Sequence, residues 1–293
     1  MKINEVLKKL KLKAKKIEKK NNVVIVSTDN GKYVIKKSHV DEKVLNYLKS
    51  RNFEYLPDLI LNNDYKMTKY VEDYNLSMEQ KVVSFIKLIT LLHSKTTYYS
   101  VVNVQENERI YNFLNDNINN LYAYYTDLIS GIESKVFMSP SDLIIADNIT
   151  RLYNSLDYNK IKLEKWHSLV SNKTRERRVV IHNNLRLDHF IRNEKSYLIN
   201  WDNSRFDSPV IDLYKLFNNH FLDFNFFELL KDYEKSYPLM EDERLLLELL
   251  ILIPENIDIT GNEYEKCLKV NKIVNRINSL PEAFEKTKKQ ESK

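Results

Sequence analysis

Two runs of β-branched residues predict a β-hairpin near the start of the chain. The stretch VVIVSTDNGKYVIKKS at 23–38 places one run on each side of Asp29-Asn30-Gly31. Asn-Gly is the preferred pair for a tight hairpin turn, which needs positive φ. The preceding segment at 10–20, LKLKAKKIEKK, is compatible with a third strand or with the end of a helix, because its spacing does not decide between them.

A helix and two short strands are expected after the hairpin. Apolar residues recur at helical spacing across 40–51, and Asp41 and Glu42 fall in its first turn. Pro57 then interrupts the pattern, and LILNND and YKMTKYVED are typical of short strands. The order strand, strand, helix, strand, strand predicts a small α+β lobe that spans 1–73.

Helical periodicity dominates the rest of the chain. The segments with an apolar helical face are 78–96, 107–130, 141–156, 159–171 and 222–285. Two stretches, 177–183 and 195–201, are instead strand-like, and they predict a hairpin over 179–201. We therefore expect a mainly helical lobe at 74–285 and a polar tail at 286–293.

Composition excludes several classes of protein. The 293 residues are 43% hydrophobic and 30% charged, which suits a large buried core. The net charge of +5 is mild and scattered, which argues against a nucleic-acid partner. A single cysteine excludes an internal disulfide framework, and no Cys/His cluster has zinc-ligand spacing. Three glycines in the whole chain exclude P-loop and Rossmann phosphate loops.

No segment has the pattern of a membrane-targeting sequence. The N-terminus MKINEVLKKLKLKAKK is charged where a signal peptide carries an apolar core. The apolar run at 245–253 is interrupted by Glu248 and is far shorter than the roughly 20 residues of a membrane span. We expect a cytoplasmic protein without a membrane partner.

Lys36 is a candidate for nucleotide chemistry. It lies on the second strand of the predicted hairpin, where alternate residues share a face. A lysine there can reach a nucleotide phosphate and be oriented by an acid of the next helix, for which Glu42 is the candidate. The alternative is that Lys36 and Lys37 are ordinary exposed lysines at a strand end.

A polar loop between strands is the second candidate region. The segment HNNLRLDHFIRNEKSYLINWDN at 182–203 places polar residues between two strand-like runs, which is a common way to build a site at a sheet edge. Asp212 follows at the start of an apolar helix, where an acid is often only a cap.

Taken in order, these features resemble the aminoglycoside phosphotransferase/choline kinase superfamily. The resemblance is carried by TDNGKYVIKK, the helix with Glu42, LLHS at 91–94, HNNLRLDHF, LINWDN and DSPVIDLYKLF, and covers nearly the whole chain. The nearest branch is the CotS-like spore-coat group. The resemblance implies a two-lobed, protein-kinase-like α+β fold with a small antiparallel-sheet N-lobe and a mainly helical C-lobe. It also implies ATP and Mg²⁺ as cofactors for an active member.

The chain departs from this family at the reacting positions. The family's catalytic loop reads His-Gly-Asp, then four residues and Asn, and a second Asp holds metal. By resemblance, His182 matches, but Asn184 stands at the catalytic Asp, His189 at the metal-binding Asn and Asn200 at the metal-binding Asp. An amide takes no proton and carries no charge, and imidazole suits Mg²⁺ poorly. Asp212, which braces the loop in the family, is retained.

Nearby carboxylates offer a route to rescue. Asp188 lies four residues after Asn184, and Asp202 lies two after Asn200 and on the same face of an extended strand. A shift by two moves a carboxylate roughly 6–7 Å along a strand, too far to hold the same ion without rebuilding the loop. The phosphate-covering turn is also altered, because Asn21-Asn22 stands where glycine is expected.

We therefore expect a catalytically impaired, pseudokinase-type protein that binds a small molecule or a protein. Its resemblance to the spore-coat branch implies coat proteins as partners and a place on the coat. The alternative is an active ATP-dependent phosphotransferase on a hydroxylated small molecule, with Asp188 or Asp202 supplying the carboxylates. A third hypothesis, nucleic-acid binding through the lysine-rich N-terminus, predicts a continuous basic face and strong salt dependence. Tyr122, Tyr124 and Tyr125 line either a substrate groove or a core.

Overall fold

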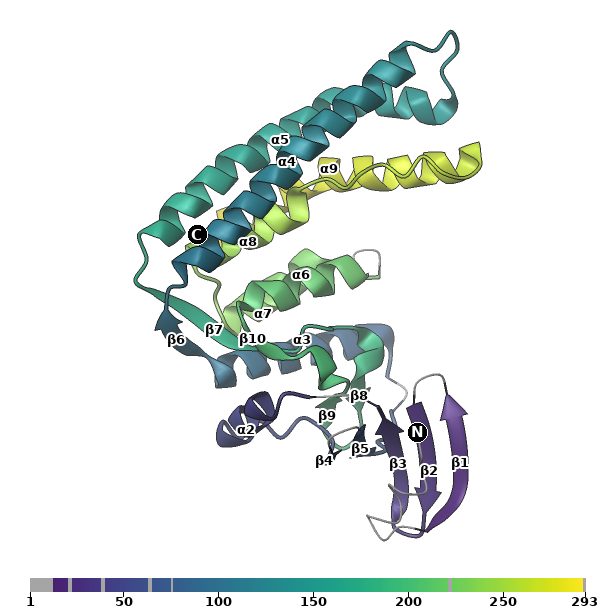
Figure 1. Ribbon diagram of the computed structural model, residues 1–293, viewed down its shortest axis with the longest axis vertical. Helices are drawn as coiled ribbons and strands as arrows, with labels where there is room; N and C mark the ends of the chain where they lie inside the picture. The colour runs from purple at the N-terminus through teal and green to yellow at the C-terminus, as the bar shows by residue number, and fades with distance from the viewer. Residues whose placement is uncertain are drawn as a thin grey trace. The chain divides into compact units, whose positions relative to one another are not determined.

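The computed structural model describes residues 13–20, 23–37, 40–62, 65–74, 76–220 and 223–291. They form two compact units (Figure 1). Unit 1 contains the described residues up to Tyr98, together with Arg177–Phe224 and Asp232–Tyr237. Unit 2 contains Tyr99–Glu176, Asn225–Lys231 and the described residues from Pro238 onward. The expected division at 1–73, 74–285 and 286–293 stays a prediction.

A five-stranded antiparallel sheet opens unit 1. Its strands are β1 Ala14–Lys20, β2 Val23–Thr28, β3 Gly31–Lys36, β4 Leu59–Asn62 and β5 Tyr65–Lys69, in the order β1-β2-β3-β5-β4. Val26, Ile35 and Met67 form its buried core. The predicted small antiparallel sheet is confirmed, with the hairpin turn at Gly31, whose φ is 118°.

The segment that periodicity left undecided forms the edge strand β1. Ile17 lies opposite Val26 of β2, while most side chains of β1 are exposed. An edge strand needs no apolar alternation on its exposed side, and lysines there discourage pairing with another chain.

Two helices follow the strands as the pattern predicts. Helix α2 spans Glu42–Ser50 and is capped by Asp41, whose side chain accepts a hydrogen bond from the Lys43 backbone. Helix α3 spans Met78–Thr96 and is capped by Ser77. Each buries one apolar face, which includes Leu48 in α2.

The rest of unit 1 is built from short strands, and the hairpin expected over 179–201 is wrong. Strand β7, Arg175–Ile181, pairs with β10, Arg205–Asp207, while β8, Phe190–Arg192, pairs with β9, Ser196–Leu198. The strand expected over 195–201 stops at Leu198, because Asn200 adopts a left-handed conformation and the 3-10 helix η2 begins at Trp201. A second 3-10 helix, η1, spans Leu187–His189, and helix α6 spans Pro209–His220. Strand β6, Tyr98–Val101, starts at the last residue of the first part of unit 1, and its other residues belong to unit 2.

Unit 2 is helical. Its long helices are α4 Val104–Glu133, α5 Pro140–Ser171, α8 Glu241–Leu252 and α9 Glu263–Glu291, and the shorter α7, Phe226–Ser236, begins in it. Helix α5 packs against α4, α8 and α9, and Figure 1 shows α4 and α5 side by side. The segments expected at 141–156 and 159–171 are one continuous helix, which starts at a capping box of Ser139 and Asp142.

The tyrosine cluster of α4 belongs to the packing of unit 2. Tyr125 is fully buried and donates a hydrogen bond to the Glu255 carbonyl at 2.6 Å, and Tyr124 donates to the Ile257 carbonyl at 2.7 Å. These bonds fix the segment between α8 and α9, which favours the core interpretation over the groove. In the part of the chain that the structure describes, no helix is both long and apolar enough to cross a membrane.

Candidate functional site

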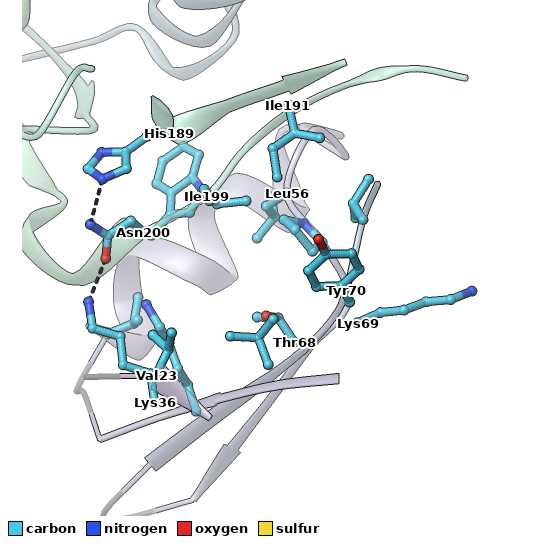
Figure 2. A pocket seen from close by; sticks show the side chains of 16 residues that line it. Val23, Lys36, Leu56, Thr68, Lys69, Tyr70, His189, Ile191, Ile199 and Asn200 are labelled. Carbon is cyan, nitrogen blue, oxygen red and sulfur yellow. Dashed lines mark hydrogen bonds between the residues drawn. The ribbon is translucent and has the colours of Figure 1, made fainter. Parts of the chain in front are cut away.

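Unit 1 contains a cavity of about 300 Å³ between its sheet and the segment that carries β8 and β9 (Figure 2). The wall is largely apolar, with Val34 from β3, Ile191 from β8 and Ile199 after β9. Lys36 and Asn200 also line it and lie close to each other. The site therefore combines an apolar chamber with a cluster of polar groups, the usual composition of a small-molecule site.

Strands β3 and β5 place two lysines in opposition. Lys36 lies directly across from Lys66 in the antiparallel register, a pairing that is destabilising for like charges. Asp202, from η2, accepts a hydrogen bond from each ammonium group. Lys66 is only 7% exposed, and burial lowers its pKa, while the contact with Asp202 opposes this effect. The Asp202 carboxylate is therefore the shared acceptor of two lysines.

A chain of hydrogen bonds joins this cluster to the polar loop (Figure 2). Lys36 Nζ donates to Asn200 Oδ1 at 2.7 Å, and Asn200 Nδ2 lies 3.1 Å from His189 Nε2. His189 Nδ1 lies 2.8 Å from the carbonyl oxygen of Asn184. Because the lysine fixes the amide oxygen, the amide donates to Nε2 and Nδ1–H donates to the carbonyl. This pattern is satisfied by a neutral His189 with its proton on Nδ1.

Asp212 holds the start of the loop. This fully buried residue of α6 accepts hydrogen bonds from the backbone N–H groups of His182 at 2.8 Å and Asn183 at 2.7 Å. His93 Nε2 lies 3.2 Å from the same carboxylate, and its Nδ1 lies 2.8 Å from the Tyr233 hydroxyl. The carboxylate thus connects the loop, α3 and Tyr233.

Two asparagines in left-handed conformation shape the loop. Asn183 has φ 59° and Asn200 has φ 68°. Asparagine tolerates this region better than most residues that have a side chain. By the resemblance, Asn183 occupies the glycine position of His-Gly-Asp, so this turn forms without glycine.

His182 is a buried structural residue of the site. It is fully buried, and its Nε2 donates to the Ile199 carbonyl at 2.8 Å. Burial lowers the pKa of His182 to about 4, so the imidazole is neutral at pH 7. Its ring meets Trp201 edge to face, with centroids 4.9 Å apart. His182 therefore ties the loop to the segment after β9.

The structure brings some expected residues together and places others elsewhere. Lys36, His189, Asn200 and Asp202 form one connected cluster. Asn184 is half-buried and supplies its carbonyl oxygen to that cluster.

Two expected acids lie outside the cluster. Asp188 has a side chain that is 63% exposed and pairs with Arg186 at 3.0 Å. Glu42 is exposed and lines a different groove, beneath α2, while the carboxylate beside Lys36 comes from Asp202. The Asn21-Asn22 turn lies outside the described residues.

Lys66 is a site residue that the sequence interpretation did not identify. Its only signal is the strand-like YKMTK, in which Lys66 and Thr68 share a face. The apposition to Lys36 depends on the register of β3 against β5, which a single sequence does not specify.

The cluster does not fit a magnesium ion. Mg²⁺ requires oxygen ligands free to surround it, usually with one or two carboxylates. Here the Asp202 carboxylate faces two ammonium groups, and Asn200 Oδ1 faces one of them. Among the described residues, no group of three His, Cys, Asp or Glu side chains is arranged to hold a metal ion.

Comparison with known proteins identifies the fold. No protein-family model matches the chain, and no curated protein matches it in sequence. Among solved structures, an aminoglycoside phosphotransferase from Alicyclobacillus acidocaldarius superposes with a TM-score of 0.66 at 10% identity, covering 94% of this chain and 93% of that one. The chain has the aminoglycoside phosphotransferase fold. An AMP-bound spectinomycin phosphotransferase gives a TM-score of 0.54 at 12% identity, covering 94% and 98%.

The aminoglycoside phosphotransferase fold confirms the kinase-like α+β class expected from the motifs, with a small antiparallel sheet in its N-terminal part and a mainly helical C-terminal part. A choline kinase from Streptococcus pneumoniae is also similar, with a TM-score of 0.48 at 16% identity, covering 94% and 98%.

Proposed function

We propose that this chain is a catalytically impaired protein of the aminoglycoside/choline kinase type, which binds a ligand or a partner and does not transfer phosphate. Phosphoryl transfer depends on a group that orients the acceptor hydroxyl and on Mg²⁺ held by protein oxygens. By the resemblance, these roles fall on Asn184, His189 and Asn200.

This proposal rests on the contacts of Asp202, the carboxylate that remains in the cluster. Asp202 lies in the cluster, but both Lys36 and Lys66 contact it, and His189 and Asn200 hydrogen-bond to each other. The groups that stand where metal ligands are expected therefore satisfy one another. Such a cluster is stable without a metal ion.

The test is calorimetric titration of ATP into the purified chain, with Mg²⁺ or with EDTA, beside an assay for ADP release with hydroxylated acceptors. We expect the same heat of binding, or none, in both buffers and no turnover. Micromolar binding that requires Mg²⁺, or phosphorylation of an acceptor, would contradict the proposal.

The double variant Asn184→Asp/Asn200→Asp serves as the matched comparison, since it returns a carboxylate to each of the two positions. A gain of Mg²⁺-dependent ATP binding in this variant alone shows that the two amides account for the loss in the natural chain.

One observation favours the alternative, an active ATP-dependent phosphotransferase. The 3-10 helix η2 places the Asp202 carboxylate in contact with Lys36. An active enzyme would exchange Lys66 for Mg²⁺ on this carboxylate. Loss of Mg²⁺-dependent binding in Asp202→Asn would support it.

The finer assignment follows the motif resemblance to the spore-coat branch: a protein that is made in the cytoplasm and deposited on the spore coat, with coat proteins as its partners. Fluorescence of a tagged chain on the coat of sporulating cells supports this assignment, and a uniform cytoplasmic signal throughout sporulation contradicts it.

A further inference from the structure

We propose that Lys36 and Lys66 form an anion-binding site that works without a divalent metal, and that Asp202 occupies it as an internal anion until a ligand displaces it. The ligand class is an anionic group, phosphate or carboxylate, carried on an apolar body. The inference rests on the proposed function, because it assigns a ligand to the same cavity.

The charge of the cluster favours the binding of a further anion. Two ammonium groups face one carboxylate, while Asn200 is uncharged and His189 is neutral in the hydrogen-bond pattern described above. Among the residues that the structure describes, the cluster therefore contains one more positive charge than negative charges. Buried charge is costly unless it is paired, so a second anion at this place is favoured.

The backbone holds the two lysines so that one anion can contact both. Direct opposition across β3 and β5 brings both side chains to the same face of the sheet, and Lys66 is almost fully buried. Two ammonium groups converging from neighbouring strands provide up to six N–H donors. A phosphate or carboxylate can accept from both, as Asp202 already does.

An apolar cavity lies beside the two lysines. Lys36 and Lys66 both line the cavity of about 300 Å³, whose other walls include Val34, Ile191 and Ile199. An apolar wall next to two lysines favours a ligand that has both an anionic group and an apolar body. A volume of this size lies at the lower end of ordinary small-molecule sites, of roughly 300–1,000 Å³.

The Asp202→Asn variant should change anion affinity in opposite directions under the two hypotheses for Asp202. If Asp202 is an internal competitor, its loss strengthens anion binding in EDTA by about tenfold, since a charge-assisted contact no longer has to be broken. If Asp202 is instead a metal ligand of an enzyme, the same change weakens binding and does so only in the presence of Mg²⁺.

Isothermal titration in EDTA uses AMP and naphthoate as probes. Adenosine, which lacks the phosphate, and inorganic phosphate, which lacks the nucleoside, serve as controls. Tighter binding of AMP assigns a phosphate ligand, and tighter binding of naphthoate assigns a carboxylate. Lys66→Met should weaken the better probe at least tenfold. Lys32→Met removes one charge from the same face of β3, at an exposed residue outside the cavity wall, and should change affinity less than twofold.

A second measurement covers the case in which Asp202→Asn does not fold. Melting temperature is then followed in the natural chain and in Lys66→Met as the better probe is added, with a larger rise expected in the natural chain. Equal shifts in the two proteins overturn the inference, as does adenosine binding as tightly as AMP without binding of naphthoate.

Absence of binding by both probes in EDTA also overturns the inference. None of these outcomes produces turnover, so each leaves the proposed loss of phosphate transfer intact. Mg²⁺-dependent phosphorylation, in contrast, overturns the proposed function itself.

Discussion

Asp212→Asn is the substitution whose effect on stability follows most directly from the site. The Asp212 carboxylate accepts hydrogen bonds from the backbone N–H groups of His182 and Asn183, one on each oxygen, and also faces His93. Asparagine has nearly the same shape but only one oxygen. One of its two ends must therefore present N–H donors to another donor.

The expected loss in free energy of unfolding is about 2–5 kcal/mol. A buried donor left without an acceptor costs about 1–3 kcal/mol, and a hydrogen bond to a charged group contributes about 1.5–3 kcal/mol against about 1 kcal/mol for a neutral one. Asp212 is fully buried, so water cannot replace the lost acceptor.

Tryptophan fluorescence during urea denaturation isolates this effect. The chain has two tryptophans, and Trp166 lies in unit 2 while Trp201 lies in unit 1 against His182. In a Trp166→Phe background, Trp201 reports the unfolding of unit 1. Both the natural Asp212 and the Asp212→Asn variant are measured in that background.

Asp73→Asn is the matched control. Asp73 also accepts a backbone hydrogen bond, from the Arg192 N–H at 2.8 Å, but its side chain is 39% exposed. Water can replace that acceptor, so the loss should stay below about 1 kcal/mol. Losses of equal size in the two variants would refute the argument from burial.

Two further predictions concern buried ionisable groups. Between its unfolded pKa near 6.5 and its folded pKa of about 4, His182 takes up a proton only in the unfolded state, so stability should fall as pH drops through this window, by about 3 kcal/mol in total. Urea denaturation at a series of pH values measures this slope, which His182→Gln should flatten; an unchanged slope assigns the acid sensitivity to other groups. In unit 2, Lys162 of α5 donates to the fully buried Glu248 of α8, so Lys162→Met should cost about 3–5 kcal/mol and Lys162→Met/Glu248→Leu should recover most of it. Trp166 fluorescence in a Trp201→Phe background follows both variants, and equal stability of the single and double variants contradicts the pairing argument.

Local patterns in the chain were sufficient to predict most elements of the fold. The Asn-Gly turn and its flanking β-branched runs predicted β2 and β3, and apolar spacing predicted α2 and α3. These elements are set by interactions between residues close in sequence, so a single sequence contains their signal. The order of the motifs along the chain also indicated the aminoglycoside phosphotransferase fold.

Short irregular segments were predicted less well. The strand expected over 195–201 ends at Leu198, and β7 pairs with β10 instead of with that strand. Three-residue strands carry almost no periodicity, and the left-handed Asn200 depends on its surroundings. Pairing between distant segments is decided by packing, which local propensity does not encode.

The residue types of the site can be read from the sequence, but the contacts between them depend on the fold. The sequence alone determined which residue types stand at the positions that the motif resemblance assigns to the reacting groups: amides at 184 and 200 and an imidazole at 189. Only the tertiary structure decided which carboxylate meets Lys36, because Glu42 and Asp202 were both available. It also decided that Lys66 joins them, since the β3–β5 register and the turn at η2 bring together side chains 136 residues apart in the chain. Hydrogen bonds and ion pairs form only between groups a few ångströms apart. For residues far apart in the sequence, that proximity is set by the tertiary arrangement of the backbone.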